Sequence, residues 1–467
     1  MRKIYRVNDD LYYIPSQGLL IRPTAVGKRD LSEGAQSSAV WWIDELIGPA
    51  TQPDVPACPS TIDAAKALPV TVGVFLTNAC SLRCTYCYSD GGRNPRVDLD
   101  TSKIDRLIKY IGRNVVIRKR LGIPATPAIS LSGGGEPTVA WDRLQYLVHR
   151  FREMCHQQGV DGQMAVSTNG FLSEDKVYYL AEHFDQVNLS YDGTPEAHDR
   201  CRPTAAGEPS SHVVERTLAI LNDSEVRFGI RCTITKHNVT HLSEIASRLF
   251  TKYPRCLVIQ VEPMFRSGRG LLCKDGVDDP HELATEVIKA MMTSARYGRW
   301  LLSTLFNPRR IGPFVCAAAA GLTFWVTPEG FLSACTEISA GDHGYEQYIR
   351  GFLSDSGVSY VSGDTCSKLH RRLDGGPCST CFAWEHCRGY CPNHAPTDEY
   401  GNFTTAYGRF ICAATRAVWY RALTELAKSN GRFVYLNSSE CDVADSIGQY
   451  VQAVYKIYGT SQKLGGT

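Results

Sequence analysis

Between residues 70 and 300 the sequence alternates strand-like and helix-like stretches, at intervals of roughly thirty residues. Apolar residues at helical spacing mark amphipathic helices over Ile104–Val115, Leu144–Cys155 and Leu242–Leu249. Such alternation requires a parallel sheet, and six units of this kind curl into an open barrel. We therefore predict an α/β fold with a partial (β/α)6 TIM-like barrel. Its strands are expected at 70–77, 128–132, 164–168, 186–191, 228–235 and 256–263.

Length and composition limit the function. A chain of 467 residues suggests two or three domains, and 43% apolar with 21% charged residues is typical of a globular protein. The net charge of +2 argues against a nucleic-acid partner. The N-terminus lacks a secretory signal, and no apolar run approaches the roughly 20 residues that span a bilayer. We expect a cytoplasmic protein without a membrane partner, whose 18 cysteines serve as metal ligands and small core residues.

Four regions are expected. Residues 1–69 form an N-terminal extension with strands near 3–7 and 11–15 and a helix near 39–47, which serves either for packing or for docking a peptide. Residues 70–305 form the barrel. Residues 306–425 hold eight of the cysteines and few long apolar runs, which fits a domain organised by metal clusters. Residues 426–467 form a tail with one helix at 447–458.

Three cysteines, Cys80, Cys84 and Cys87, follow the first predicted strand on a loop. In barrels of this kind the chemistry lies at the carboxyl ends of the strands. Three thiolates supply a cubic iron–sulfur cluster with three of its four ligands and leave one iron open to a small molecule. The alternatives are a zinc site or buried thiols. The glycine-rich turn Ser132–Thr138 ends the next strand and lets the backbone approach a ligand closely.

This CxxxCxxC pattern, with Tyr86 before its last cysteine, resembles the radical S-adenosylmethionine (SAM) superfamily. The resemblance implies a [4Fe-4S] cluster on the three thiolates. Its open iron would bind the amino and carboxylate groups of SAM, and reductive cleavage would give a 5′-deoxyadenosyl radical that abstracts a hydrogen atom. Gly134, Gly135, Glu136 and Pro137 match the family motif that binds the methionine amino group.

Polar residues at the ends of the third and fourth strands match family positions that hold the ribose and carboxylate of SAM. They are Ser167, Asn169 and Ser190. Arg231 lies inside the fifth strand, where a buried charge needs an anionic partner, and the carboxylate of SAM is one such partner. Ordinary turns and, for Arg231, a structural salt bridge are the alternatives. His198–Arg202 also resembles a family stretch, to which we assign no role beyond a substrate-side wall.

The C-terminal cysteines resemble the SPASM extension of peptide-modifying radical enzymes. Thirteen residues, Gly330 and four more residues separate Cys316 from Cys335, and a C-x2-C-x5-C-x3-C run precedes the last cysteine by twenty residues. The resemblance implies two auxiliary four-iron clusters and thus three [4Fe-4S] clusters in all. One would be held by Cys378, Cys381, Cys387 and Cys412. The other would be held by Cys316, Cys335 and Cys391, and we predict Cys366 as its fourth ligand, the alternative being an open iron. CxxC pairs also bind zinc, which is the competing interpretation of this region.

The seven remaining cysteines are expected to fill the core. These are Cys58, Cys155, Cys201, Cys232, Cys256, Cys273 and Cys441.

As a class, SPASM enzymes act on peptides. We therefore expect an oxidoreductase that crosslinks a ribosomally made precursor peptide through a thioether, C–C or C–O bond, with flavodoxin or ferredoxin as electron donor and residues 1–69 as a possible contact for the leader peptide. An anaerobic sulfatase maturase is the nearest alternative, but such enzymes place a catalytic Asp directly after the cysteine where this chain has Thr336. Glu337 is a candidate catalytic base. A non-catalytic multi-cluster electron carrier is the alternative from another class.

Overall fold

A computed structural model describes residues 4–15, 18–22, 68–92, 95–308, 316, 324–338, 346–354, 357–361, 377–428 and 433–435. The predicted helix at 39–47, the predicted helix at 447–458 and the three cysteines Cys58, Cys366 and Cys441 lie outside these ranges.

The helices and strands are as follows. The helices are α3 (Thr101–Arg120), α4 (Trp141–Gln158), α5 (Glu174–His183), α6 (Pro195–Cys201), α7 (Ser211–Asp223), α8 (Leu242–Lys252), α9 (Pro280–Arg296), α12 (Trp384–Cys387) and α13 (Ala406–Leu426). The strands are β1 (Tyr5–Asn8), β2 (Leu11–Ile14), β3 (Leu19–Ile21), β4 (Thr71–Val74), β5 (Ala128–Leu131), β6 (Gln163–Thr168), β7 (Gln186–Ser190), β8 (Arg227–Ile234), β9 (Val258–Pro263), β10 (Trp300–Leu302), β11 (Trp325–Val326), β12 (Phe331–Ser333), β13 (Ile349–Ser354), β14 (Gly357–Tyr360) and β15 (Phe433–Tyr435).

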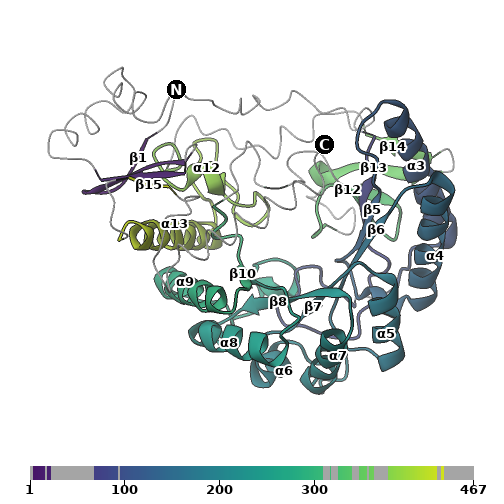
Figure 1. The fold of residues 1–467 in the computed structure, drawn as a ribbon, viewed down its shortest axis with the longest axis horizontal. Coiled ribbons are helices and arrows are strands. Elements are labelled where there is room, and N and C mark those ends of the chain that lie inside the picture. Colours follow the sequence, from purple (N-terminus) through teal and green to yellow (C-terminus); the bar gives the residue numbers. More distant parts are fainter. Residues whose placement is uncertain are drawn as a thin grey trace.

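The predicted parallel sheet is confirmed. Strands β4 to β9 pair in sequence order, each parallel to the next, and the sheet curves with helices α3 to α9 along its outer side (Figure 1). The predicted apolar stripes face inward: Ile104 and Leu107 of α3 and Leu144 and Leu147 of α4 are fully buried. Burying these stripes against the sheet stabilises the fold, because each such side chain contributes roughly 1.5–3 kcal/mol of transfer free energy. No helix among the described residues is long and apolar enough to cross a membrane.

The sheet extends beyond the six predicted strands. At one end β10 pairs parallel to β9, and at the other β11 pairs parallel to β4 and leads into the antiparallel strands β12 to β14. The sheet therefore crosses the domain boundary predicted at residue 305. The periodicity could not reveal β10 and β11, because three and two residues are too few to show an alternation.

The described N-terminal residues form a second, four-stranded sheet in the order β1-β2-β3-β15. The two strands predicted near 3–7 and 11–15 are confirmed as β1 and β2. The Tyr13 hydroxyl lies 2.8 Å from Nε2 of His386, and the His386 ring stacks on Trp419 of α13 at 4.1 Å between centroids. This sheet thus packs on the cysteine-rich C-terminal region. Strand β15 lies within the tail for which only a helix was predicted.

Candidate active site

A cavity of about 190 Å³ lies at the carboxyl ends of the parallel strands. All the predicted residues of the radical SAM site except Pro137 line it, and Pro137 is buried directly after them in the chain. The lining includes Cys80, Cys84, Tyr86, Cys87, Gly134, Gly135, Glu136, Ser167, Asn169, Ser190 and Arg231. The fold thus brings together residues that span 150 positions of the sequence, because successive parallel strands end at the same edge of the sheet.

The cysteine loop is held by the segment after α6. Leu82 and Thr204 form an isolated antiparallel bridge, the Arg83 N–H donates to the Pro203 carbonyl at 2.8 Å, and the Thr85 N–H donates to the Cys201 carbonyl at 2.9 Å. The stretch His198–Arg202, predicted at most to form a wall on the substrate side, therefore leads into a short ladder that fixes the backbone between Cys80 and Cys87.

The three thiols suit an iron–sulfur cluster. Burial raises the pKa of Cys80 to about 11, with Glu136 adding to the effect, and burial raises the pKa of Cys84 to about 12 against the opposing charge of Arg202. The thiolates of Cys80 and Cys84 are therefore costly unless a cation binds them. N–H groups already point at two of the sulfurs: Asn169 Nδ2 lies 3.6 Å from Cys80 Sγ and the Gly91 N–H 3.4 Å from Cys87 Sγ.

The glycine-rich turn lies directly against the cysteine loop. The Gly135 N–H donates to the Thr77 carbonyl and the Glu136 N–H to the Ala79 carbonyl, both at 2.8 Å. Gly133 and Gly134 have φ of +84° and +69°, which favour glycine. A Cβ on Gly133 would also lie 2.7 Å from the Thr336 carbonyl oxygen, so the turn contacts the C-terminal region as well.

Glu136 is fully buried, and its carboxylate is already surrounded by donors. Oε1 accepts from Thr138 N, Thr138 Oγ1 and Thr168 Oγ1 at 3.2, 2.8 and 2.9 Å, and Oε2 accepts from the Asn169 N–H at 2.6 Å. Burial raises its pKa while these hydrogen bonds oppose the rise. The residue predicted to accept from an ammonium thus also organises the ends of β5 and β6.

Tyr86 belongs to a buried polar network below the cavity. Its hydroxyl donates to Asp192, which also accepts from Arg202 Nε at 3.1 Å and from the Thr233 N–H at 3.1 Å. The Arg202 guanidinium lies over the Tyr86 ring, 5.2 Å from its centroid. The aromatic residue of the cysteine motif is therefore positioned by an ion pair whose two residues follow β7 and α6 in the chain, and neither residue was predicted to belong to the site.

Further lining residues were also missed. Gln260 and Glu262 lie on one face of β9, Gln260 opposite Arg231 of β8 and Glu262 one residue before the strand ends. Glu262 accepts from Thr304 N at 3.0 Å. Burial raises the pKa of Glu262. Their polarity at the end of a strand was the available signal, and it was the same signal that identified Ser167 and Ser190.

The C-terminal cysteines form two groups. Burial and then Glu337 raise the pKa of Cys335 most, and the neighbouring thiols of Cys391 and Cys316 raise it further. Burial raises the pKa of Cys387 to about 12, with contributions from Cys412, Cys381 and Cys378. These neighbours match the two ligand sets implied by the resemblance; which centres they hold stays a prediction.

Glu337 lies beside the first of these groups. Its N–H is 3.5 Å from Cys335 Sγ, and its carboxylate binds Asn393 Nδ2 at 3.1 Å and His394 Nε2 at 2.7–2.8 Å. The His394 ring stacks on Phe265 of the cavity wall at 4.2 Å. Burial raises the pKa of Tyr88, a cavity residue, to about 12, and Glu337 contributes to that shift. Glu337 therefore stands between the cavity and the Cys335 group.

The prediction of core cysteines is confirmed for the five that are described. They are Cys155, Cys201, Cys232, Cys256 and Cys273, all of them buried.

Comparison with known families agrees with this site. Residues 74–249 match the Radical SAM superfamily. The chain contains a radical SAM domain. This domain spans β4 to α8 and includes all three cysteines of the loop and the polar residues at the ends of β5 to β8.

The similarity to curated radical SAM proteins extends beyond that domain. Mycofactocin maturase MftC of Mycobacterium tuberculosis is 27% identical over 343 residues, which cover 69% of this chain and 78% of the relative. The serine-type anaerobic sulfatase-maturating enzyme of Klebsiella aerogenes is 23% identical over 71% of this chain and 82% of its own.

Two solved structures share the fold. A structure of anSMEcpe with bound AdoMet and Kp18Cys peptide aligns with a TM-score of 0.59 at 17% identity, over 77% of this chain and 99% of the other. Streptococcus suis SuiB bound to precursor peptide SuiA aligns with a TM-score of 0.51 at 12% identity, over 88% of this chain and 100% of the other.

Proposed function

We propose that this radical SAM enzyme is a peptide maturase that abstracts a hydrogen atom from a residue of a ribosomally made precursor and installs a thioether, C–C or C–O crosslink. The observation that carries the proposal is the contact between two cysteine sites: the segment Cys335–Glu337 lies against the glycine turn of the SAM cavity at Gly133. A substrate in that cavity thus lies beside both cysteine sites.

Cys80, Cys84 and Cys87 would hold the [4Fe-4S] cluster, which when bound supplies the electron for reductive cleavage of SAM. Gly134 to Pro137 would bind the amino group of SAM. Ser167, Asn169, Ser190 and Arg231 would bind its ribose and carboxylate, and burial of the cavity would exclude water from them.

Two auxiliary [4Fe-4S] clusters complete the proposal. The grouping of the described cysteines supports one cluster on Cys378, Cys381, Cys387 and Cys412 and another on Cys316, Cys335 and Cys391. Cys366 is proposed as the fourth ligand of the second. Residues 306–425 would then be a SPASM domain, residues 70–305 a partial barrel, and residues 1–69 a leader-peptide contact.

The peptide substrate is supported by the relatives. The names and titles above refer to a maturase, to a bound peptide and to a precursor peptide. Glu337 is the proposed proton acceptor for the oxidative step, because His394 and Asn393 orient its carboxylate near the cavity. Flavodoxin or ferredoxin is the proposed electron donor.

Maturation of a sulfatase is the second candidate, since the sulfatase-maturating enzyme of Klebsiella aerogenes is similar over 71% of this chain. That reaction would oxidise Cys or Ser to formylglycine. Thr336 stands where those enzymes carry a catalytic Asp, which favours the crosslinking proposal.

Iron analysis and two substrates test the proposal. Anaerobically reconstituted protein should bind about twelve iron atoms per chain, and the triple variant Cys80→Ala/Cys84→Ala/Cys87→Ala about eight, with loss of SAM cleavage. Close to four iron atoms in the unaltered protein would refute the auxiliary clusters. Mass spectrometry should find a loss of two hydrogens without loss of sulfur or oxygen in a precursor encoded beside the enzyme. Formylglycine in a sulfatase peptide would instead establish the second candidate.

A further inference from the structure

We propose that a groove between α9 and α13 is the docking site for a small acidic electron-carrier protein. The groove encloses about 870 Å³ and shares no lining residue with the SAM cavity. Its apolar floor is formed by Ile288 and Met292 of α9 and by Phe382, Ala413 and Ala417. Tyr420, which is 41% exposed, stands at its edge.

The charge of the groove favours an acidic partner. Lys289, Arg416 and Arg421 line it, against one lining carboxylate, Glu425, and Lys289 is itself paired with Glu286 at 2.7 Å. Lys428 neutralises Glu425 at 2.6 Å. Within the described part of the chain, Arg416 and Arg421 form no salt bridge. Arg416 is exposed and Arg421 is half-buried. The whole chain carries a net charge of only +2, so this pair of uncompensated arginines is a local feature. Charge complementarity of this kind speeds the association of two proteins.

The position of the groove favours an electron carrier over a peptide. Phe382 directly follows Cys381 and Ala413 directly follows Cys412. Burial raises the pKa of Cys381, and the nearby charge of Arg416 opposes that rise. Two of the four cysteines in one proposed auxiliary site therefore lie behind the groove wall. A peptide bound in the groove would not thereby enter the SAM cavity. A carrier docked in the groove would only have to transfer an electron to the centre held by these cysteines.

The proposed step transfers one electron and makes no bond. The reduced carrier loses the electron and the centre held by these cysteines gains it, without movement of a proton. A small, weak interface suits this task, because electron-transfer complexes bury little surface and dissociate quickly. The inference rests on the proposed function, since it requires the auxiliary site at Cys378, Cys381, Cys387 and Cys412.

The test uses charge reversal in the groove, with reduced flavodoxin as the probe. In Arg416→Glu/Arg421→Glu, the rate of reduction by flavodoxin at low salt and the affinity for labelled flavodoxin should each fall about tenfold or more. Reduction by dithionite, which needs no docking surface, should stay unchanged. Arg416→Lys/Arg421→Lys should retain most of the flavodoxin rate.

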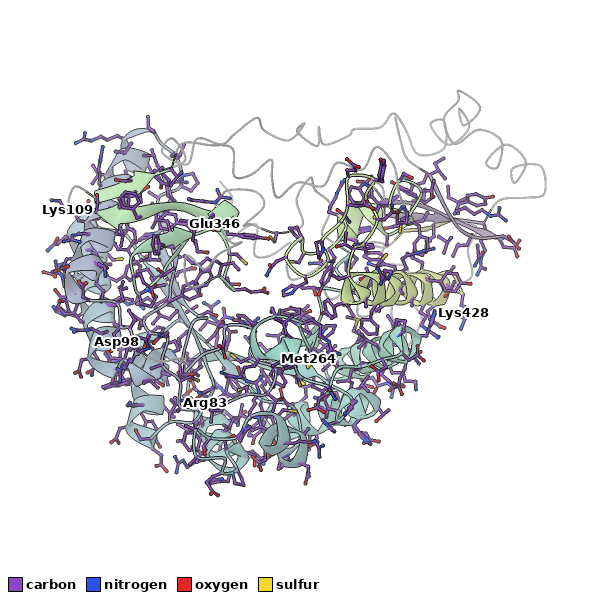
Figure 2. All side chains as sticks on the ribbon, turned by 180° about the vertical axis from the view of Figure 1, so that it is seen from behind. Arg83, Asp98, Lys109, Met264, Glu346 and Lys428 are labelled. Carbon is purple, nitrogen blue, oxygen red and sulfur yellow. The ribbon has the colours of Figure 1, made fainter. Side chains whose placement is uncertain are left out.

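A matched control carries the same charge change elsewhere. Lys109→Glu/Arg113→Glu alters two exposed residues of α3, and Lys109 lies at the opposite end of the molecule from Lys428 beside the groove (Figure 2). An equal loss in this control, or no loss in the groove variant, would overturn the proposal. So would a groove variant that retains flavodoxin reduction but no longer modifies the peptide.

The two hypotheses fail differently. If iron analysis finds no auxiliary clusters, the proposed function fails while flavodoxin affinity remains measurable. If twelve iron atoms bind but charge reversal at Arg416 and Arg421 leaves the flavodoxin affinity and reduction rate unchanged, only the docking proposal fails.

Discussion

His198 is a histidine held neutral by its surroundings. Its side chain is fully buried, and its Nδ1 accepts a hydrogen bond from the Asp192 N–H at 3.4 Å. Burial lowers its pKa from 6.5 to about 4, against the opposing attraction of Asp192. Between these two values the unfolded chain binds a proton that the folded chain does not. The free energy of unfolding should therefore fall as the pH falls, by about 2 kcal/mol from this residue between pH 7 and pH 5.

Urea unfolding of the wild type and of His198→Asn at both pH values measures this contribution. Asparagine offers an acceptor oxygen near the position of Nδ1 but does not titrate. The variant should be less stable at pH 7 because a cavity remains, and its stability should depend less on pH than that of the wild type. An equal pH dependence in both proteins would show that folding does not lower the pKa of His198.

Single residues show how far the sequence predicts the site. Ser167, Asn169 and Arg231 line the cavity as expected, because a parallel sheet determines where its strands end. The surroundings of Glu136 were not predictable. Three of its donors belong to Thr138 and Thr168, and which hydroxyls reach a buried carboxylate depends on the register of β5 against β6.

At the scale of elements, the glycine turn after β5 tests the link between the two cysteine sites. Gly133→Ala adds a Cβ that meets both the Thr336 carbonyl and the Phe75 ring. Positive φ alone should cost about 1 kcal/mol of stability. Displacement of the turn should in addition weaken SAM binding about tenfold, which corresponds to roughly 1.4 kcal/mol. Isothermal titration of SAM into the reconstituted enzyme measures this effect.

Gly207→Ala is the matched control. Gly207 has φ of +86°, close to that of Gly133, and a Cβ there meets nothing within 4 Å. It should lower the melting temperature similarly and leave the affinity for SAM unchanged. Equal affinities in all three proteins would mean that the contact with Thr336 does not position the turn.

Helices and strands differ in how well the apolar periodicity of the sequence predicts them. The stripes of α3 and α4 repeat over several turns, and every residue that the spacing selected is buried, together with Gly112, Asn114 and Met154. Three strands, β10, β11 and β15, have only two or three residues each. They are strands because they pair with the edges of β9, β4 and β3, which lie far away in the sequence. Tertiary pairing of this kind leaves no period in the sequence.

At the scale of the whole molecule, one large apolar core joins the parallel sheet and its helices to the C-terminal region, where Phe382, Ala383 and Tyr390 belong to it. The segment around these three residues has little regular structure of its own. Residues 377–391 contain four predicted ligands but only the four-residue helix α12, so metal binding should supply much of their stability. Removal of iron by a chelator should therefore speed tryptic cleavage after Arg388 about tenfold or more, as followed by mass spectrometry.

Cleavage after Arg255 is the internal reference, because this arginine lies on the loop between α8 and β9 and is 43% exposed. Its rate should be the same with and without iron. If cleavage after Arg388 is equally slow in both forms, the C-terminal region folds without its proposed clusters.

The pairing of β4 with β11 has a consequence for biosynthesis. Gly73 and Val74 lie beside Trp325 and Val326, which are synthesised more than 250 residues later, and the Trp325 indole occupies the space that a side chain at position 73 would need. During translation one edge of β4 must therefore remain unpaired until β11, and thus most of the chain, has left the ribosome. Contacts so distant in sequence form slowly and leave an intermediate prone to aggregation. The contact between the two cysteine sites, at Gly133 and Thr336, should therefore form in the last step of folding.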